Sequence, residues 1–440
     1  MALAAAPSRI DPEVIADQLL EARARTLLLA APLTDDDLHL QHDPLMSPIL
    51  WDLGHIAHFE ELWLTRNLDG PIQFVEMPGL YNPFEHPRSA RGKLALPGLE
   101  EVRDVMDEIR GRVLARLVSA DFDAATPLLR DGFVYQMVLQ HEYQHNETIL
   151  QTLQLKQGAP YRPLARVEVP RGPAVSPIRG SMVRFPGGVV EIGTDDRSAA
   201  YDNERPRHTV DLPPFLIDTY PVSNQDFLVF IAAGGYETRE HWSEAGWQWR
   251  TESGARAPKY WNFTDGLWTT RSMDRIGPVE PSHPVCHVTW YEAEAFARYA
   301  GKRLPTELEW EAAASWDPAT GRKRPYPWGD APPDRTLANV DQLTFGTAPL
   351  GAYARNVSPI GCYGMIGDVW EWTASDFAPW PGFESFPYRE YSEVFFGSEY
   401  KVLRGGSWAT RPGAVRNTFR NWDYPIRRQI FSGFRCARDA

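Results

Sequence analysis

Three histidines in the first third of the chain have the spacing expected of ligands to one metal ion. His141 and His145 are four residues apart in HEYQH. On a helix such a pair is rotated by only about 40°, so both imidazoles face the same way. His55 lies in WDLGHIAHFEE, inside a second helical pattern, and ligands on facing helices converge in the core of a bundle. Three neutral imidazoles leave coordination positions open, whereas a closed structural site needs a fourth ligand.

The same residues also allow plainer roles. An isolated histidine pair on a helix is often solvent-exposed or hydrogen-bonded, and His58 competes with His55 for the third ligand position. We prefer His55 because its helix face also carries Trp51 and Leu62, so its ring should point inward. Imidazole ligands do not choose between zinc, iron, nickel and copper. The spacing therefore predicts an open three-histidine site without naming its metal.

Four amphipathic helices are expected to position these histidines. Asp11-Pro12 and Ser47-Pro48 each read as a cap followed by proline in the first turn. Apolar residues at helical spacing predict helices from Asp11 onward and over 49–68, 99–118 and 132–155. Helices of this length form a bundle. The connection over 78–97, rich in Pro, Asn and Arg, has a size typical of functional loops.

The composition and the hydrophobic periodicity of the sequence change after the fourth predicted helix. We assign residues 1–160 to the helical domain, 161–180 to a proline-rich linker and 181–440 to a second domain. The second domain has short β-like runs with many Gly and Trp, and it has few helical periods. Its clearest helices are 291–299 and 306–314, and the latter starts with a capping box of Thr306 and Glu309. An α+β multidomain fold is therefore expected.

Composition excludes several classes of function. A length of 440 residues suggests at least two domains, and the net charge of −13 argues against general binding of nucleic acid. No stretch approaches the roughly 20 apolar residues of a membrane span. Three scattered cysteines, Cys286, Cys362 and Cys436, form no disulfide framework. We expect a cytoplasmic protein without membrane or nucleic-acid partners, either a monomer or a weak homo-oligomer.

Ordered motifs in the second half carry a family resemblance. In sequence they are FLIDTYPVSNQDFLVFI, HPVCHVTWYEAEAFARYAGKRLPTELEWEAAA, YPWGD, GMIGDVWEWT, VLRGGSW and SGFRCAR. This part resembles the formylglycine-generating-enzyme (sulfatase-modifying-factor) domain, which implies a C-type-lectin-like α+β fold. Formylglycine-generating oxidases need two cysteines after the GGS motif, whereas Thr410 and Val415 occupy the corresponding positions here. Because neither residue can form a thiolate, that chemistry is not expected.

The first half resembles a DinB-like four-helix bundle through SPILWDLGHIAHFEELWL and HEYQHNETILQTL. A DinB-like bundle ahead of a sulfatase-modifying-factor domain is the architecture of the EgtB-type sulfoxide synthases of ergothioneine biosynthesis. The resemblance covers essentially the whole chain. It implies Fe(II) at His55, His141 and His145. The implied reaction uses O2 to join the sulfur of γ-glutamylcysteine to the imidazole of hercynine (Nα-trimethylhistidine), giving a sulfoxide.

The resemblance also implies where the substrates bind. Cationic clamps suit the carboxylates of γ-glutamylcysteine, because the planar fork of arginine grips a carboxylate at two points. The expected thiol-binding residues are Arg88, Arg91, Asp423 and Arg427. Our own candidates for binding hercynine are Gln144, Asn421 and Trp422, and the alternative for Trp422 is a structural role in the core. An aromatic face suits a trimethylammonium group.

The resemblance also implies that a tyrosine of the C-terminal domain donates a proton to the bound oxygen. The loop FAPWPGFESFPYREYSEVFF offers Tyr388 and Tyr391, and we choose Tyr388. Three other hypotheses for the function stay open. They are a zinc- or nickel-dependent thiol transferase of the DinB type, a related synthase that takes cysteine as thiol donor, and a lectin-like binding module whose histidines are structural.

Overall fold

The computed structural model describes residues 11–70, 79–123, 125–172 and 180–440. The chain divides into two compact units. The first comprises Met1–Thr152 together with Asp196–Tyr201, and the second comprises Leu153–Asp195 and Asp202–Ala440. A short downstream segment therefore packs with the helices of the first unit, although it follows them by more than forty residues.

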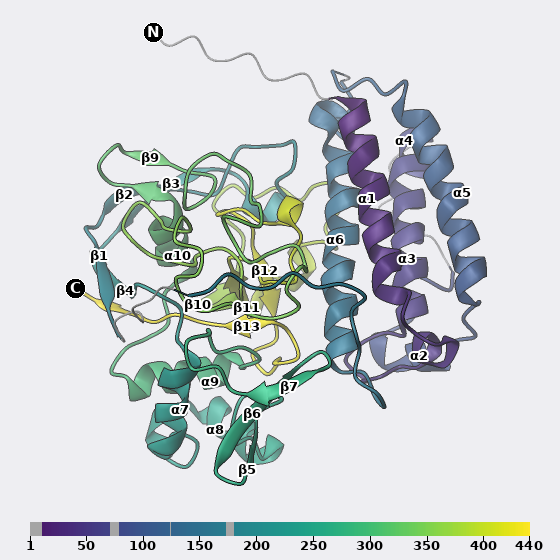
Figure 1. Ribbon diagram of the computed structural model, residues 1–440. Coiled ribbons are helices and arrows are strands. Elements are labelled where there is room, and N and C mark those ends of the chain that lie inside the picture. Colours follow the sequence, from purple (N-terminus) through teal and green to yellow (C-terminus); the bar gives the residue numbers. More distant parts are fainter. Residues whose placement is uncertain (1–10, 71–78, 124, 173–179) are drawn as a thin grey trace. The chain divides into compact units, whose positions relative to one another are not determined.

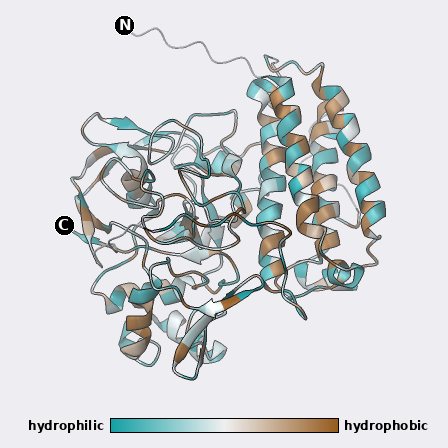
Figure 2. Cartoon of the chain, viewed as in Figure 1, coloured by the Kyte–Doolittle hydropathy of each residue, from teal (hydrophilic) through white to brown (hydrophobic). Residues whose placement is uncertain are grey.

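The first unit is helical, and its long helices lie side by side (Figure 1). The helices that build it are α1 (Pro12–Ala30), α2 (Asp35–His39), α3 (Ile49–Glu61), α4 (Asn67–Asp69), α5 (Leu99–Leu117) and α6 (Phe133–Gln154). A π-helical turn over Leu62–Arg66 joins α3 to α4, and 3-10 turns cover Arg88–Lys93 and Arg130–Gly132. Hydrophobic stripes run along the long helices and alternate with hydrophilic ones (Figure 2). The expected bundle is confirmed.

The helix starts show how far local signals determine structure. Asp11 caps α1 as expected, because its carboxylate accepts a hydrogen bond of 2.9 Å from the amide of Glu13. The expected cap at Ser47 is wrong. Helix α3 begins at Ile49 without a side-chain cap, and the hydroxyl of Ser47 instead accepts from Nη1 of Arg91 at 2.8 Å. A long-range partner has replaced the local one.

A ring of four buried charges lies between the long helices. Arg23 on α1 bonds Glu60 on α3 at 2.7 Å and Glu142 on α6 at 3.0 Å. Arg110 on α5 bonds the same two carboxylates at 2.6 Å and 3.0 Å. Burial opposes ionisation of Glu142, but the two arginines outweigh it and hold the pKa of this carboxyl below its ordinary value. Each charge therefore has two partners of opposite sign, on two different helices.

The second unit contains small sheets and short helices joined by long loops (Figure 1). Its helices are α7 (Asn224–Ala232), α8 (Glu244–Ser253), α9 (Trp290–Tyr299) and α10 (Glu307–Ser315). Its 3-10 turns are Asp202–Glu204, Arg239–His241, Glu393–Phe395 and Pro412–Ala414. Helix α10 begins with the expected capping box of Thr306 and Glu309, so this prediction is confirmed.

Two of the sheets organise the second unit. One has the order β1 (Met182–Phe185), β4 (Phe215–Asp218), β14 (Ala437–Asp439); the other has the order β12 (Asn421–Asp423), β11 (Gly397–Arg404), β10 (Trp370–Phe377), β13 (Ser432–Gly433). The smaller sheets are β2 (Gly188–Ile192) with β3 (His208–Leu212), β5 (Asn262–Thr264) with β6 (Leu267–Ser272) and β7 (Arg275–Pro278), and β8 (Trp316–Asp317) with β9 (Arg322–Lys323). The α+β class is confirmed.

Buried arginines hold the irregular parts of the second unit together. Arg404 and Arg435 are fully buried. Arg404 pairs with Glu307 at 2.7 Å and Glu311 at 2.6 Å, and Arg435 pairs with Glu371 at 2.7 Å. Arg435 also donates to the loop carbonyls of Tyr363 and Gly364 and to the carbonyl of Asp218 at the end of β4. Because loops lack ladder hydrogen bonds, a multivalent buried donor can satisfy several of their carbonyls at once.

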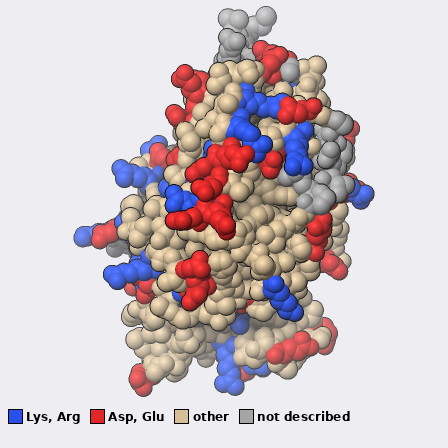
Figure 3. Space-filling model, turned by 90° about the vertical axis from the view of Figure 1, so that its right-hand side faces the viewer, with Lys and Arg blue, Asp and Glu red and all other residues tan. Residues whose placement is uncertain are grey.

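The distribution of charged side chains on the surface agrees with the acidic composition of the chain. On the face drawn in Figure 3, lysine and arginine side chains are interspersed with acidic ones and do not merge into a continuous basic surface. Within the described part of the chain, no helix is both long and apolar enough to cross a membrane.

The charge ring predicts a large and specific loss of stability. Arg110→Met should lower the free energy of unfolding of the metal-free chain by about 3–5 kcal/mol, because two buried carboxylates lose a partner. Urea unfolding followed by far-ultraviolet circular dichroism measures the change.

The matched control is Arg112→Met on the same helix. Arg112 pairs with Glu61 at 3.4 Å, and its side chain is 48% exposed, so its removal should cost less than about 1 kcal/mol. Equal losses in the two variants would show that the ring does not stabilise the bundle.

Candidate metal centre

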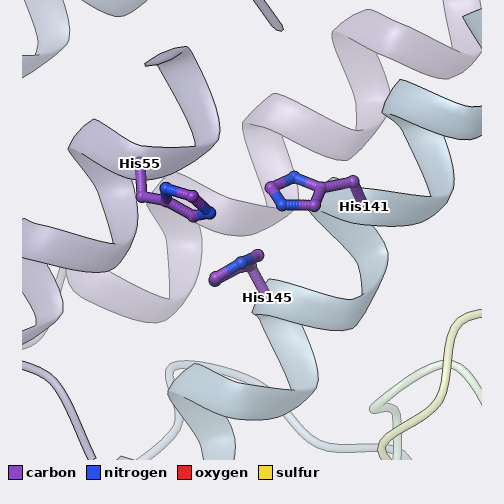
Figure 4. Close-up of side chains that lie close together, drawn as sticks. All are labelled: His55, His141 and His145. Carbon is purple, nitrogen blue, oxygen red and sulfur yellow. The ribbon is translucent and has the colours of Figure 1, made fainter. Parts of the chain in front are cut away.

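Helices α3 and α6 bring the three histidines to one point. The nitrogens that His55, His141 and His145 can offer to a metal all lie within 4.8 Å of one another. The ring centroids are 4.5–5.2 Å apart, and the rings turn toward a common centre (Figure 4). The structure thus brings together the histidines that the spacing singled out.

His58 takes no part in this group. Its ring is stacked beside that of His55 with 6.2 Å between centroids, and its side chain is only half-buried whereas His55 is buried. Of the two histidines, it is therefore His55, on the helix face that carries Trp51, that lies beside His141 and His145.

Each ring is held in place in a different way. Nδ1 of His55 donates to the backbone carbonyl of Tyr81 at 2.9 Å. Nδ1 of His145 donates to Oδ1 of Asp52 at 3.2 Å. These bonds place the proton on Nδ1 and leave the lone pair of Nε2 for a metal. His141 is instead stacked on Phe59, with ring centroids 3.7 Å apart and planes 10° from parallel.

The electrostatics of the group suit metal binding. Burial is the main cause that lowers the pKa of His55 and of His141 well below the ordinary histidine value, and the neighbouring His145 adds to it. A metal ligand must be a neutral imidazole, so no proton has to be displaced from these rings near neutral pH.

The donor set fits a metal with open coordination positions. Among the described residues, the group of potential ligands consists of the three histidines and includes no thiol or carboxylate. Nδ1 of His141 is buried and makes no hydrogen bond to the described residues, so this ring is not held by a competing polar partner. Three nitrogen ligands with free positions are typical of catalytic metal sites.

The loop that starts at Gly79 is attached to α3 beside the centre. Nε1 of Trp51 donates to the carbonyl of Leu80 at 3.0 Å, and His55 bonds the next carbonyl, that of Tyr81. The ring of Tyr81 lies where a side chain at Gly54 would be. Glycine is required here for close approach rather than for its backbone angles.

Arg91, which is expected to bind the thiol substrate, makes its contacts and hydrogen bonds mainly within the first unit. Its guanidinium carbon is 3.4 Å from the centre of the Trp51 ring, which in turn stacks on His55 at 4.8 Å. It donates to the carbonyl of His86 and to the hydroxyl of Ser47, both at 2.8 Å. Burial is the main cause that lowers the pKa of Arg91 to about 10. Arg88, by contrast, is exposed.

Gln144, expected near hercynine, contacts the downstream segment of the first unit. It lies between the two ligands on α6, and its amide nitrogen is 3.3 Å from the hydroxyl of Tyr201. One turn earlier, Gln140 donates to the carbonyl of Ala199 at 2.8 Å. Sequence reasoning missed Tyr201 because no local pattern connects residues this far apart in the chain.

The remaining predicted binding residues lie together in the second unit. Asn421, Trp422 and Asp423 form the edge strand β12, paired with β11. Trp422 is half-buried and stacks on Phe377 at 4.1 Å. Nε of Arg427 lies 3.5 Å from Oδ1 of Asp423. Asp423 and Arg427, which are both expected to bind the thiol substrate, therefore contact each other.

The candidate proton donor lies in the loop beside this strand. The rings of Tyr388 and Tyr391 are 6.2 Å apart, and both are half-buried. Tyr391 contacts Trp422 edge-on at 5.9 Å between centroids. The structure thus places both tyrosines of the pair near the predicted hercynine-binding strand of the same unit.

Comparison with known proteins identifies the family. Residues 18–149 match the DinB superfamily, and residues 172–440 match the sulfatase-modifying factor enzyme 1-like domain. A hercynine oxygenase of Mycolicibacterium thermoresistibile is 46% identical over 97% of this chain and 94% of its own length. That of Mycobacterium tuberculosis is 46% identical over 97% of this chain and 99% of its own length. This chain belongs to the hercynine oxygenase family.

The second domain of the chain also resembles formylglycine-generating enzymes. That of Thermomonospora curvata is 37% identical over 60% of this chain and 94% of its own length. The positions expected to carry its cysteines hold Thr410 and Val415, both buried. The cysteines of this chain lie elsewhere, at Cys286, Cys362 and Cys436, so the thiol pair has no counterpart here.

Gly54 provides a test of the link between the loop and the centre. Gly54→Ala should weaken binding of a divalent metal by about 10-fold or more, because the new methyl group displaces Tyr81, whose carbonyl holds His55. Titration of the metal-free chain with Co(II), followed by visible absorption, measures the affinity.

Gly111→Ala on α5 is the control. A methyl group there meets no atom within 4 Å, so it should leave metal affinity unchanged and stabilise the helix by about 0.5–1 kcal/mol. An unchanged affinity in the Gly54→Ala variant would show that Tyr81 does not support His55.

Proposed function

We propose that this chain is a hercynine oxygenase that uses Fe(II) and O2 to join the sulfur of γ-glutamylcysteine to hercynine as a sulfoxide. The function rests chiefly on near-full-length similarity to hercynine oxygenases, together with the convergence of His55, His141 and His145. A metal-dependent oxygenase follows from these observations. The choice of iron and of the thiol is our proposal.

Iron is proposed because a metal ion that activates O2 must be able to change its oxidation state, which zinc does not do. When bound by His55, His141 and His145, Fe(II) would supply open coordination positions and one-electron chemistry with O2. The chain's own contribution is to orient the three imidazoles through Tyr81, Asp52 and the neighbouring Phe59.

Arg427 supports the proposed binding of γ-glutamylcysteine. Its Nε and Nη1 are buried and make no hydrogen bond to the described residues, although Asp423 lies 3.5 Å away. Buried guanidinium N–H groups without acceptors are suited to a carboxylate. We propose that Arg427 and the exposed Arg88 bind carboxylates of the thiol substrate and that Asp423 binds its ammonium. Arg91 then contributes mainly by supporting Trp51.

We propose that Gln144, Asn421 and Trp422 bind hercynine. A half-buried indole suits the trimethylammonium group, which is attracted to the face of an aromatic ring. The stack of Trp422 on Phe377 occupies one face of the indole and fixes its plane. Tyr388 is the proposed proton donor, and its neighbour Tyr391 contacts Trp422.

The decisive experiment is O2 uptake by the anaerobically purified chain reconstituted with Fe(II). We expect uptake only when hercynine and γ-glutamylcysteine are both present, and a sulfoxide product in the mass spectrum. Activity with zinc in the absence of O2 would instead indicate a thiol transferase. Equal turnover with free cysteine would indicate the related synthase, and no turnover with any metal would indicate a binding module.

His141→Ala tests the ligand set in the same assay. Turnover should fall below detection because two imidazoles hold the metal weakly, while the circular dichroism spectrum should stay that of the parent. The matched control is His58→Ala, whose ring lies outside the group of ligands, and it should retain most activity. Full activity of His141→Ala would remove this residue from the site.

Arg88→Ala tests the thiol clamp. The KM for γ-glutamylcysteine should rise about 10-fold or more, as expected for loss of a charge-assisted hydrogen bond, while the KM for hercynine changes little. Lys93→Ala removes an exposed cation from the same 3-10 turn and should affect neither constant. Equal increases for both substrates would contradict the assignment.

A further inference from the structure

One buried carboxylate beside the metal centre is paired differently from the other buried carboxylates described in the bundle. Asp52 on α3 is 1% exposed, and its Oδ1 accepts from Nδ1 of His145 on α6 at 3.2 Å. Its other oxygen, Oδ2, is buried and makes no hydrogen bond to the described residues. Glu60 and Glu142, also buried in this bundle, each pair with two arginines.

Stability alone does not explain such a group. A buried carboxylate with one oxygen unsatisfied destabilises the folded chain. The guanidinium of Arg91 interacts electrostatically with Asp52, but Arg91 donates hydrogen bonds to the carbonyl of His86 and the hydroxyl of Ser47. Asp52 therefore lacks the full set of partners that would make it a favourable structural ion pair.

The position of Asp52 suggests what it does for the site. His55 is held by a neutral carbonyl and His141 by an aromatic ring, whereas His145 is held by a carboxylate. A carboxylate bonded to the far nitrogen of an imidazole fixes its tautomer and makes the near nitrogen a better donor. It also places negative charge close to the bound cation.

We propose that Asp52 is a positioning residue for the metal centre. It holds His145 with Nε2 toward the metal. Its negative charge also raises the affinity of the three histidines for a divalent cation. The proposal rests on the three histidines being the metal ligands, as in the proposed function. It concerns affinity for the metal and requires no step of the reaction.

Two substitutions separate orientation from charge. Asp52→Asn keeps the shape and an acceptor for Nδ1 of His145 but removes the charge. Asp52→Ala removes both. If both effects matter, affinity for Co(II) should fall by about 10-fold in the first variant and by about 100-fold in the second. Glu61→Gln, on the same helix and in a partly exposed ion pair, is the matched control and should bind Co(II) like the parent.

The experiment is a titration of each metal-free chain with Co(II) under anaerobic conditions, with visible absorption as readout and thermal unfolding of the metal-free form alongside. We expect both Asp52 variants to melt at or above the parent's temperature yet bind Co(II) more weakly, with an altered absorption spectrum. Unchanged affinity and spectrum in both variants would overturn the proposal.

A lower melting temperature of the metal-free Asp52 variants with unaltered cobalt spectra would also overturn it, because Asp52 would then be structural. The titration contains no substrate or O2, so the outcome does not depend on turnover. If hercynine oxygenation fails while the affinity series holds, the proposed function is wrong and the role of Asp52 stands.

Discussion

The structure of the first unit depends on the ring of charges formed by Arg23, Glu60, Arg110 and Glu142. Each of the four longest helices of this unit, α1, α3, α5 and α6, contributes one member, and a charge buried without its partners is strongly destabilising. Hydrophobic stripes alone would tolerate helices that slide or rotate slightly. The ring does not, because its hydrogen bonds require one register. Glu60 and Glu142 lie on the helices that also carry the histidines, so the ring sets the positions from which the imidazoles converge.

The sequence was sufficient to predict features that depend on local spacing. The pairing of His141 with His145, the inward direction of His55 and the capping box of α10 all follow from helical geometry. Features that depend on distant contacts could not be predicted. Nothing near Asp52 in the chain indicates that it reaches His145 on another helix, and the carbonyl of Tyr81 carries no side-chain signal. Ser47 was misread because a local cap and a distant Arg91 compete for one hydroxyl.

The motifs that reveal the family are mostly structural in this chain. Arg404 comes from VLRGGSW and Arg435 from SGFRCAR, and both are fully buried. Their partners Glu307, Glu311 and Glu371 come from TELEWEAA and DVWEWT. Motif residues that pair with one another across an irregular fold report its architecture. The residues proposed to bind substrate lie outside these pairs, so the family resemblance gave the fold directly and the chemistry only by comparison.

The attachment of the loop to α3 has a consequence for how the protein responds to its ligands. Trp51 and His55 bond successive carbonyls at Leu80 and Tyr81, so ordering the loop and orienting a metal ligand are one event. Binding equilibria that share an ordering step are thermodynamically linked, and the linkage is reciprocal. Any small molecule that stabilises this loop in its observed position therefore raises the affinity of the site for its metal. Conversely, a chain stripped of metal holds such a molecule less tightly by the same factor.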